Sequence, residues 1–508
     1  MSQRDVAGNR LGIMGDCATP HENRLYKLAK RAEKGRDKYA LRALMHHAEY
    51  EIDARADQYE ESAGIKLAKN AVCGKMRGQV VSLRLTREYG SAVFGQAYHC
   101  GNVWLCPDCQ ATITAHRGDE VQQLPDWAIA HGKQVVFLTY TAAHNANMPL
   151  KEFGGRLQKA YRAYWNRKGI RRMIKRCGMK VDGLERAPRI KVTEYTHSFS
   201  HRWHKHFHVL VVADMSVDMT AYIKDMQEMW VSCCVDYGLC ADNEQARADL
   251  MAHGLDIKVA KSAEQARKFA RYMAKEISSS AVKVSRATDR EEHHTIWELA
   301  VGLAVAEHDC PADAPKYRDA IAEYAYYTRG KAQMVWSAGL KAAVGVADVS
   351  DEALVDSQDD DTAETVCGLL RPAWQYVQHN VTQQELKDIA LSGGGIKAVA
   401  HYFAVRGIAD AVISADMTDL VIACETGEYT VAQQGRELEA ETMLGVCRAI
   451  NDACSDNTYY QAPPILGRKP VERYTQDEKM SIMDSRTTPQ SEWLRAVSAE
   501  FRDTGVIA

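Results

Sequence analysis

The segment Trp203–Leu210 alternates polar and apolar side chains with a period of two, and this pattern constrains the fold more than any other. Successive side chains of a β-strand point to opposite faces of the sheet. We therefore expect His204, His206 and His208 on one face, while Phe207 and its alternate neighbours point into a core. The pattern predicts a strand that packs into a core on one side and presents histidine side chains on the other.

The segments around this strand predict a mixed fold. Their order of strand, helix, strand, strand, helix is typical of an α+β domain with an antiparallel sheet and helices packed on one face. Beyond about residue 290 the patterns are helical only. The expected elements are a buried strand at 135–141, a basic helix at 150–176, strands at Arg189–Thr196 and His206–Ala213, and helices at 217–236 and 263–279.

The length of 508 residues implies several domains. Cysteine clustering, element order and an acidic stretch between Asp348 and Glu364 mark the boundaries. The predicted regions are an N-terminal helical region (1–72), a zinc-binding module (73–125), a nuclease domain (130–285), a helical region (286–346), an acidic linker (347–365) and a mainly helical C-terminal module (366–508).

The histidine face is a candidate metal site. Imidazoles two residues apart on a strand can bind one ion, and Glu194 on the adjacent predicted strand offers an oxygen ligand. A mixed nitrogen and oxygen set with vacant positions favours a catalytic Mg²⁺ or Mn²⁺ over a closed zinc site. Spacing alone leaves open which two of the three histidines are ligands. The alternative is a histidine-rich strand without a metal.

Tyr272 lies in a predicted helix with Lys275 and Glu276 three and four positions later, so the three share a face. A phenol has a pKa near about 10 and is a poor nucleophile at neutral pH. A neighbouring cation and a metal ion on a phosphate would both assist its attack. The alternative is a core tyrosine whose hydroxyl reaches water.

A cysteine cluster precedes the first predicted sheet strand. Cys106 and Cys109 form a Cys-Pro-x-Cys turn, Cys100 lies six residues before it, and Cys73 can complete a set of four thiolates. This spacing indicates structural Zn²⁺, since thiolates suit its tetrahedral geometry. His99 and His116 are rival fourth ligands, and a set of reduced, buried cysteines is the alternative.

Charge is distributed unevenly although the net charge is only −3. Residues 151–210 contain 16 Lys and Arg against 4 Asp and Glu. Such a basic segment is typical of a polyanion-binding surface, although a solvated helix face would give the same pattern. No apolar run is long enough to span a membrane, and the N-terminus does not resemble a secretory signal. We therefore expect a cytoplasmic protein.

Taken together, the FLTYT strand, Glu194, the run from Trp203 to Leu210 and Tyr272-Met-Ala-Lys275 resemble the ordered motifs of plasmid rolling-circle Rep proteins, which are HUH endonucleases. The Cys100–Cys109 region and the helical segment 297–345 carry further likeness, so the resemblance covers roughly half the chain. It implies that His206 and His208 bind the catalytic metal, that Tyr272 is the nucleophile, and that Lys275 is the basic residue one turn on.

The resemblance also has a departure. Some members carry a glutamate one turn before the tyrosine that helps to end replication, and this position is Lys268 here. Glu276 and Glu264 are the nearest acidic substitutes. We find no second tyrosine one turn from Tyr272.

The function implied by the resemblance is a replication initiator of plasmid or phage origin DNA. It would nick one strand by tyrosine attack, form a 5′-phosphotyrosyl intermediate and later rejoin the strand. The chain has no GxxxxGK[ST] loop, so a host helicase and a host polymerase are expected partners. The alternatives are a relaxase or single-tyrosine HUH transposase, and a non-catalytic, zinc-dependent DNA-binding regulator.

Overall fold

The computed structural model describes most of the chain from residue 19 to residue 426. The described residues are 19–35, 37–59, 66–86, 90–143, 147–181, 184, 187–279, 293–356, 363–408, 411–426 and 445. The chain divides into two compact units, each of which we treat by itself. The first comprises Met1–Asn70 and Asn102–Val349, and the second Ala71–Gly101 and Ser350–Ala508.

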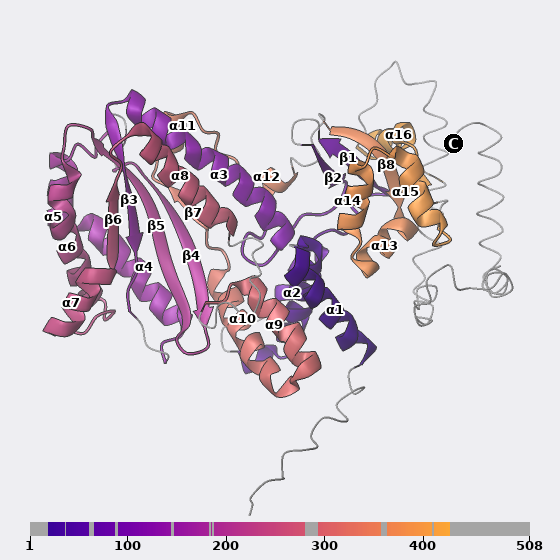
Figure 1. The fold of residues 1–508 in the computed structure, drawn as a ribbon, viewed down its shortest axis with the longest axis horizontal. Helices are drawn as coiled ribbons and strands as arrows, with labels where there is room; N and C mark the ends of the chain where they lie inside the picture. Colours follow the sequence, from indigo (N-terminus) through magenta and orange to yellow (C-terminus); the bar gives the residue numbers. More distant parts are fainter. Residues whose placement is uncertain are drawn as a thin grey trace, which may run out of the picture. The chain divides into compact units, whose positions relative to one another are not determined.

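A five-stranded antiparallel sheet forms the centre of the first unit (Figure 1). Its order is β6-β3-β5-β4-β7, so the histidine strand β5 is the middle strand. β3, β4 and β5 are the strands predicted from sequence, and each is longer than predicted. The bounds are β3 (Lys133–Tyr140), β4 (Arg189–Ser198), β5 (Arg202–Asp214), β6 (Leu255–Val259) and β7 (Met334–Trp336).

Helices cover both faces of this sheet, which corrects the expectation of one covered face. On one face α4 (Leu150–Asn166), α5 (Lys168–Arg176) and α6 (Ile223–Asp236) pack over Phe207, Val209 and Val211. On the other face α3 (Pro107–Ala130) and α8 (Ala263–Ser279) pack over Phe137, Leu210 and Val212. Sequence alternation identified only the first core, because the apolar residues of the second lie beyond the histidines on the same face of β5.

The predicted helices are present with changed bounds. The basic helix expected at 150–176 is interrupted at Arg167, whose extended backbone (ψ 143°) separates α4 from α5. The helix expected at 217–236 begins as the short 3₁₀ turn η4 (Met219–Tyr222) before α6, and α7 (Glu244–His253) follows it. The helix expected at 263–279 is α8. No helix in the described ranges is long and apolar enough to cross a membrane.

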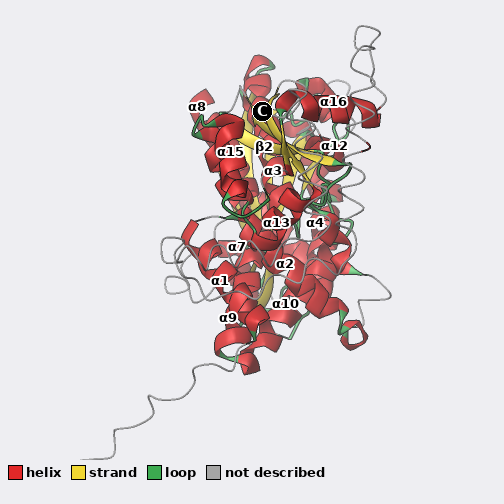
Figure 2. Ribbon diagram, turned by 90° about the vertical axis from the view of Figure 1, so that its right-hand side faces the viewer, coloured by secondary structure: helices red, strands yellow, loops and turns green. Residues whose placement is uncertain are grey.

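Four helices of the first unit form a group of their own, in which α9 contacts α1, α2 and α10 (Figure 2). Asp37 caps α2 by accepting hydrogen bonds from two backbone N–H groups, and Thr295 and Glu298 form a capping box at α9. The bounds are α1 (Pro20–Gly35), α2 (Lys38–Asp53), α9 (Ile296–Asp309) and α10 (Ala314–Thr328); η1 (Ala56–Gln58), η3 (Leu67–Val72), η5 (Pro311–Asp313) and α11 (Leu340–Val344) complete this part.

The second unit contains a four-stranded antiparallel sheet of order β2-β1-β8-β9. The expectation of helices alone beyond residue 290 is therefore wrong, since β7, β8 and β9 are strands. A short apolar run such as that of β8 fits a helix or a strand equally well, and its partner β1 is remote in sequence. The elements are β1 (Val80–Thr86), β2 (Ser91–Gly95), α12 (Asp351–Asp356), β8 (Ala363–Leu370), α13 (Arg371–Asn380), α14 (Gln383–Leu391), α15 (Gly395–Ala404), β9 (Val412–Ile413) and α16 (Ala415–Thr426).

A glycine run at 393–395 lies where helix α14 gives way to helix α15. Gly393 has a φ of +80°, which a residue with a side chain rarely adopts. Helix α14 ends two residues before it, and α15 begins two residues after it. The remainder of the predicted C-terminal module, 427–508 apart from residue 445, lies outside the described residues.

Candidate active site on the histidine strand

The register of the sheet places polar groups from three strands on one face. His206 of β5 is opposite Glu194 of β4, and His208 is opposite Thr139 of β3. His204 lies on the same face, two residues before His206. The sequence predicted the three histidines on a common face and Glu194 on the adjacent strand, and the register brings Glu194 onto the histidine face.

His208 is held at both ring nitrogens. Its Nε2 lies 2.9 Å from Glu194 Oε2, and its Nδ1 lies 3.2 Å from Thr139 Oγ1. The ring is 6% exposed and stacks on Phe137 with 5.7 Å between ring centroids. A side chain fixed at two atoms and one face keeps a single orientation, which is the condition for a precise ligand.

His204 is engaged differently from the other two histidines. Its Nε2 lies 2.7 Å from Thr141 Oγ1, and its ring stacks on Phe153 of α4. The centroids of His204 and His206 are 4.2 Å apart, whereas those of His206 and His208 are 6.4 Å apart and nearly parallel. The parallel pair nearest Glu194 is therefore His206 and His208, with His204 turned to the hydroxyl of Thr141.

Tyr272 faces this group from α8. Its ring is 6.4 Å from that of His208 and meets Phe137 edge-on at 5.6 Å. Neighbouring Ala270 and Met273 are fully buried in the core beneath α8, yet Tyr272 is 48% exposed. A core tyrosine would be buried like its neighbours, so this phenol is supported on its ring and open to solvent.

The remaining residues predicted on this helix lie near its solvent side. Lys275, Lys268 and Glu264 are exposed on α8. Glu276 belongs to α8, but its side chain lies outside the described residues. The ring of Tyr272 contacts the rings of Phe137 and His208.

The distances around Glu194 are compatible with one divalent ion, although the fit is incomplete. Adjacent ligands of an octahedral ion with bonds of about 2.1 Å lie about 3 Å apart, close to the 2.9 Å between Glu194 and His208. Within the described ranges, however, the sets of three or more ligand atoms that lie within 4.8 Å of one another both contain Cys73. A third ligand atom is not gathered here to that distance.

The four predicted cysteines meet at a second site. The sulfur atoms of Cys73, Cys100, Cys106 and Cys109 all lie within 4.8 Å of one another, and this cluster could hold a metal such as zinc. Cys106 is the N-cap of α3, with Pro107 following it. The proline fixes the backbone at the helix start, where it places Cys106 and Cys109 together.

The rival zinc ligands are less suitable in the structure. His99 and Asp108 form an alternative set with Cys73. Asp108 is already ion-paired with Lys38 at 2.6 Å and Arg42 at 2.9 Å, so its charge is neutralised. His116 is exposed on α3 and belongs to no such set among the described residues. The four thiols therefore form the better donor set.

Sequence reasoning missed the hydroxyls of Thr139 and Thr141. Thr139 lies in β3 and Thr141 directly follows its last residue, Tyr140; both belong to the run that predicted this strand. Alternation predicts that both hydroxyls share a face. That this is the histidine face follows only from the register, which sets Thr139 opposite His208. Residues on separate strands give no register from sequence alone.

The first unit is thus an α+β fold whose central antiparallel sheet carries a histidine and carboxylate group beside a half-exposed tyrosine. The chain is similar to "Protein rep" from Streptomyces lividans, with 23% identity over 406 residues, covering 68% of this chain and 86% of that protein. No family model matches the chain. No solved structure matches it.

Proposed function

We propose that this protein is a replication initiator that nicks origin DNA by the HUH mechanism, with Tyr272 as nucleophile. The observation that carries the proposal is the half-exposed Tyr272 ring beside His208, which is itself bonded to Glu194. The likeness to a protein named rep supports a role in replication at low identity. It spans most of both chains, as expected for a shared overall function.

The proposed step exchanges one phosphodiester for another. The phenolic oxygen of Tyr272 attacks the phosphorus of the scissile phosphate and loses its proton. The bond to the 3′ oxygen breaks, and that oxygen takes up a proton to become a 3′-OH. The product is a 5′-phosphotyrosyl ester. Since one ester replaces another, the 3′-OH can later reverse the reaction and rejoin the strand.

His206, His208 and Glu194 are the residues that would hold Mg²⁺ or Mn²⁺. When bound, such an ion would withdraw charge from the phosphate that Tyr272 attacks. Binding of such an ion would displace the proton through which His208 Nε2 contacts Glu194, and Thr139 Oγ1 could then accept a hydrogen bond from Nδ1–H. His208 Nε2 would then be free of a proton and able to act as a ligand.

Lys275 lies one turn after Tyr272 and is exposed, so it can approach the phosphate that the tyrosine attacks. A cation there favours the phenolate and the charged phosphate together. Glu276 and Glu264 are the carboxylates of this helix that we assign to the later resolution of the intermediate. Lys268 occupies the position where some relatives have a carboxylate.

The four-cysteine cluster is assigned to a structural Zn²⁺ that fixes the start of α3. Elemental analysis of purified protein should give one zinc per chain, reduced in Cys106→Ser. Helix α3 packs with α8 in one core on the sheet. Loss of this metal should therefore lower thermal stability as well. Zinc content equal to that of wild type would remove the assignment.

The partners follow from the reaction. Origin DNA is the substrate: the basic segment 151–191 would contact phosphates of the duplex origin, and the scissile phosphate would reach Tyr272 as a single strand. A host helicase would separate the strands, and a host polymerase would extend the 3′-OH.

A covalent-adduct assay tests the proposal. Purified protein is incubated with Mn²⁺ and labelled single-stranded oligonucleotides that tile the DNA carrying its coding sequence, then separated on a denaturing gel. We expect an adduct with wild type and none with Tyr272→Phe. The matched control is Tyr50→Phe on α2, a tyrosine that is 58% exposed and should retain the adduct.

Absence of an adduct with every oligonucleotide would favour the non-catalytic regulator. An adduct that persists in Tyr272→Phe would move the nucleophile to another residue. A relaxase or transposase would give the same adduct but would act on DNA from a transfer origin or element end.

A further inference from the structure

Helix α5 carries a dense set of positive charges that the proposed chemistry does not use. Five of its nine residues are exposed cations, and the helix contains no acidic residue. Within the described part of the chain, none of the five takes part in an ion pair. They are Lys168, Arg171, Arg172, Lys175 and Arg176.

Other cations of the basic segment are already engaged. Arg156 pairs with Glu152, and Arg167 pairs with Asp236. Arg189 lies over the ring of Trp165, and Lys191 lies over that of Phe207. Exposed cations of α4, such as Lys159 and Arg162, also belong to this segment, but α5 has the highest density, with five exposed cations in nine residues.

The position of α5 distinguishes it from the nicking site. Its apolar residues Ile170 and Met173 are buried in the core shared with α4 and α6. That core lies on the sheet face opposite α8, which carries Tyr272. A molecule bound to α5 is consequently on the other side of the sheet from the proposed nucleophile.

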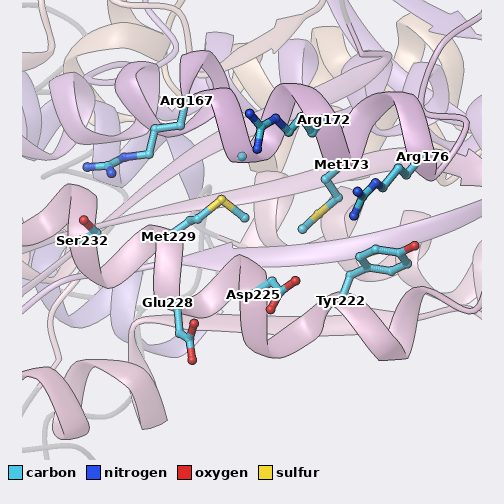
Figure 3. A pocket seen from close by; sticks show the side chains of 10 residues that line it. Arg167, Arg172, Met173, Arg176, Tyr222, Asp225, Glu228, Met229 and Ser232 are labelled. Atoms are coloured by element: carbon cyan, nitrogen blue, oxygen red, sulfur yellow. The ribbon is translucent and has the colours of Figure 1, made fainter.

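A cleft of about 410 Å³ lies beside this helix (Figure 3). Arg172 and Arg176 line it on the α5 side, and Asp225 and Glu228 line it on the α6 side. No ion pair of 4.0 Å or less joins the two walls among the described residues. The α5 wall of the cleft is therefore positively charged, and the α6 wall carries negative charges.

We propose that the exposed face of α5 binds the backbone of duplex DNA, on a surface separate from the nicking site. This inference rests on the proposed function for the identity of the polyanion. Apart from Gly169, the exposed residues of α5 are all cations, with no apolar anchor of the kind that protein interfaces bury. Phosphate contacts require only cations.

The dimensions of the helix agree with this partner. Nine residues at 1.5 Å each give a helix of about 13 Å, which matches about four base pairs at 3.4 Å. The carboxylates of Asp225 and Glu228 would repel phosphates and so limit the contact to the α5 side. A duplex is also too wide to enter the cleft itself, so it lies across the outer face of α5.

For the reaction, this means that duplex binding and strand nicking take place on different surfaces. Duplex DNA would be held on one side of the sheet, while the separated strand reaches Tyr272 on the other. Binding of duplex and nicking of a single strand should then be separable by mutation, although both take place on one domain.

Fluorescence anisotropy of the full-length protein with a labelled duplex of arbitrary sequence, in EDTA and at several salt concentrations, tests the surface. Arg171→Gln with Lys175→Gln should weaken duplex binding about tenfold or more and lower the slope of log K against log salt by about 1.8. The matched control, Lys27→Gln with Lys34→Gln, removes the same charge from exposed positions of α1 and should bind like wild type.

The opposite wall supplies a second variant. Asp225→Asn with Glu228→Gln removes repulsion and should leave duplex affinity equal or higher. A loss of affinity in this variant would overturn the proposal, because it would mean that the carboxylates contact the DNA inside the cleft. Equal duplex binding and salt slope for the α5 variant and wild type would overturn it as well.

The outcome is independent of the nicking proposal. Anisotropy in EDTA requires no metal and no covalent step, so duplex binding can be lost or kept whatever Tyr272 does. If the protein nicks, the α5 variant should still form the adduct with a single-stranded oligonucleotide at the wild-type rate. Loss of that adduct at unchanged thermal stability would contradict the separation of the two surfaces.

Discussion

The two faces of strand β5 differ in what their side chains do, although the residues alternate along one chain segment. On one face Trp203, Lys205 and Phe207 are nearly inaccessible and packed by α4 and α10. On the other, His206 is partly exposed, and Tyr272, whose ring lies 6.4 Å from that of His208, is 48% exposed. One face stabilises the sheet, and the other leaves polar atoms accessible.

The difference teaches where chemistry can be placed in a small sheet. A residue that fills a core cannot also reach a substrate, so packing on the histidine face comes from Leu210 and Val212, farther along β5, which are buried under α3 and α8. The open face in turn holds its polar groups by hydrogen bonds from neighbouring strands, as Thr139 and Glu194 do for His208.

The largest effect is expected when Phe207→Ala is compared with His206→Ala. These adjacent residues lie on opposite faces of β5. Phe207 is fully buried, so its truncation should lower the free energy of unfolding by about 3–5 kcal/mol. His206→Ala should cost less than about 1 kcal/mol and abolish adduct formation. Urea denaturation measures the first effect. Similar losses of stability in both variants would contradict the difference between the two faces of β5.

A smaller effect is expected from Thr139→Val. The hydroxyl that holds His208 Nδ1 is removed while the strand keeps a β-branched side chain, so stability should change little. Loss of a partner that orients a metal ligand costs about 10–100-fold in metal affinity or activity. Adduct formation against Mn²⁺ concentration measures it. Thr193→Val, a buried threonine on the packed face, is the control and should leave the Mn²⁺ dependence unchanged.

The smallest effect is a change in the pH dependence of stability and concerns Lys205. Its Nζ donates hydrogen bonds to Gly154 O and to the hydroxyl of Tyr327. Burial, aided by nearby cations, lowers its pKa from 10.5 to about 7. The unfolded chain therefore binds more protons between these values, so stability should rise with pH, by at most about 1.4 kcal/mol per pH unit. Denaturation at pH 7.5 and 9 should show a smaller rise for Lys205→Met. Lys268→Met, exposed on α8, should behave like wild type.

Sequence reasoning located the open face but described its surroundings incompletely. Alternation placed the histidines of β5 on one side, and the strands β3 and β4 were predicted from β-branched and aromatic runs. The contribution of Thr139 depends on register between strands about 70 residues apart in sequence, which local pattern does not contain. The apolar core farther along the same face was missed for a related reason, since its cover comes from α3 and α8, which lie before β3 and after β6 in the chain.

The second sheet illustrates the same limit. β8 was interpreted as helix because an apolar octapeptide fits either structure, and only its partner decides between them. The cysteines, by contrast, were brought together as predicted, because three of the four lie within ten residues and the spacing itself encodes the turn.

The pairing of β1 with β8 has a consequence for synthesis. Arg84 and Ala363, neighbours in this sheet, are 279 residues apart in the chain. At about 5–20 residues per second, a ribosome needs roughly 15–55 s to supply the second strand after the first. During that time the β1–β2 hairpin has an unpaired edge, and an edge strand is a template for wrong partners. The second unit is therefore completed last, after every strand of the histidine sheet has left the ribosome.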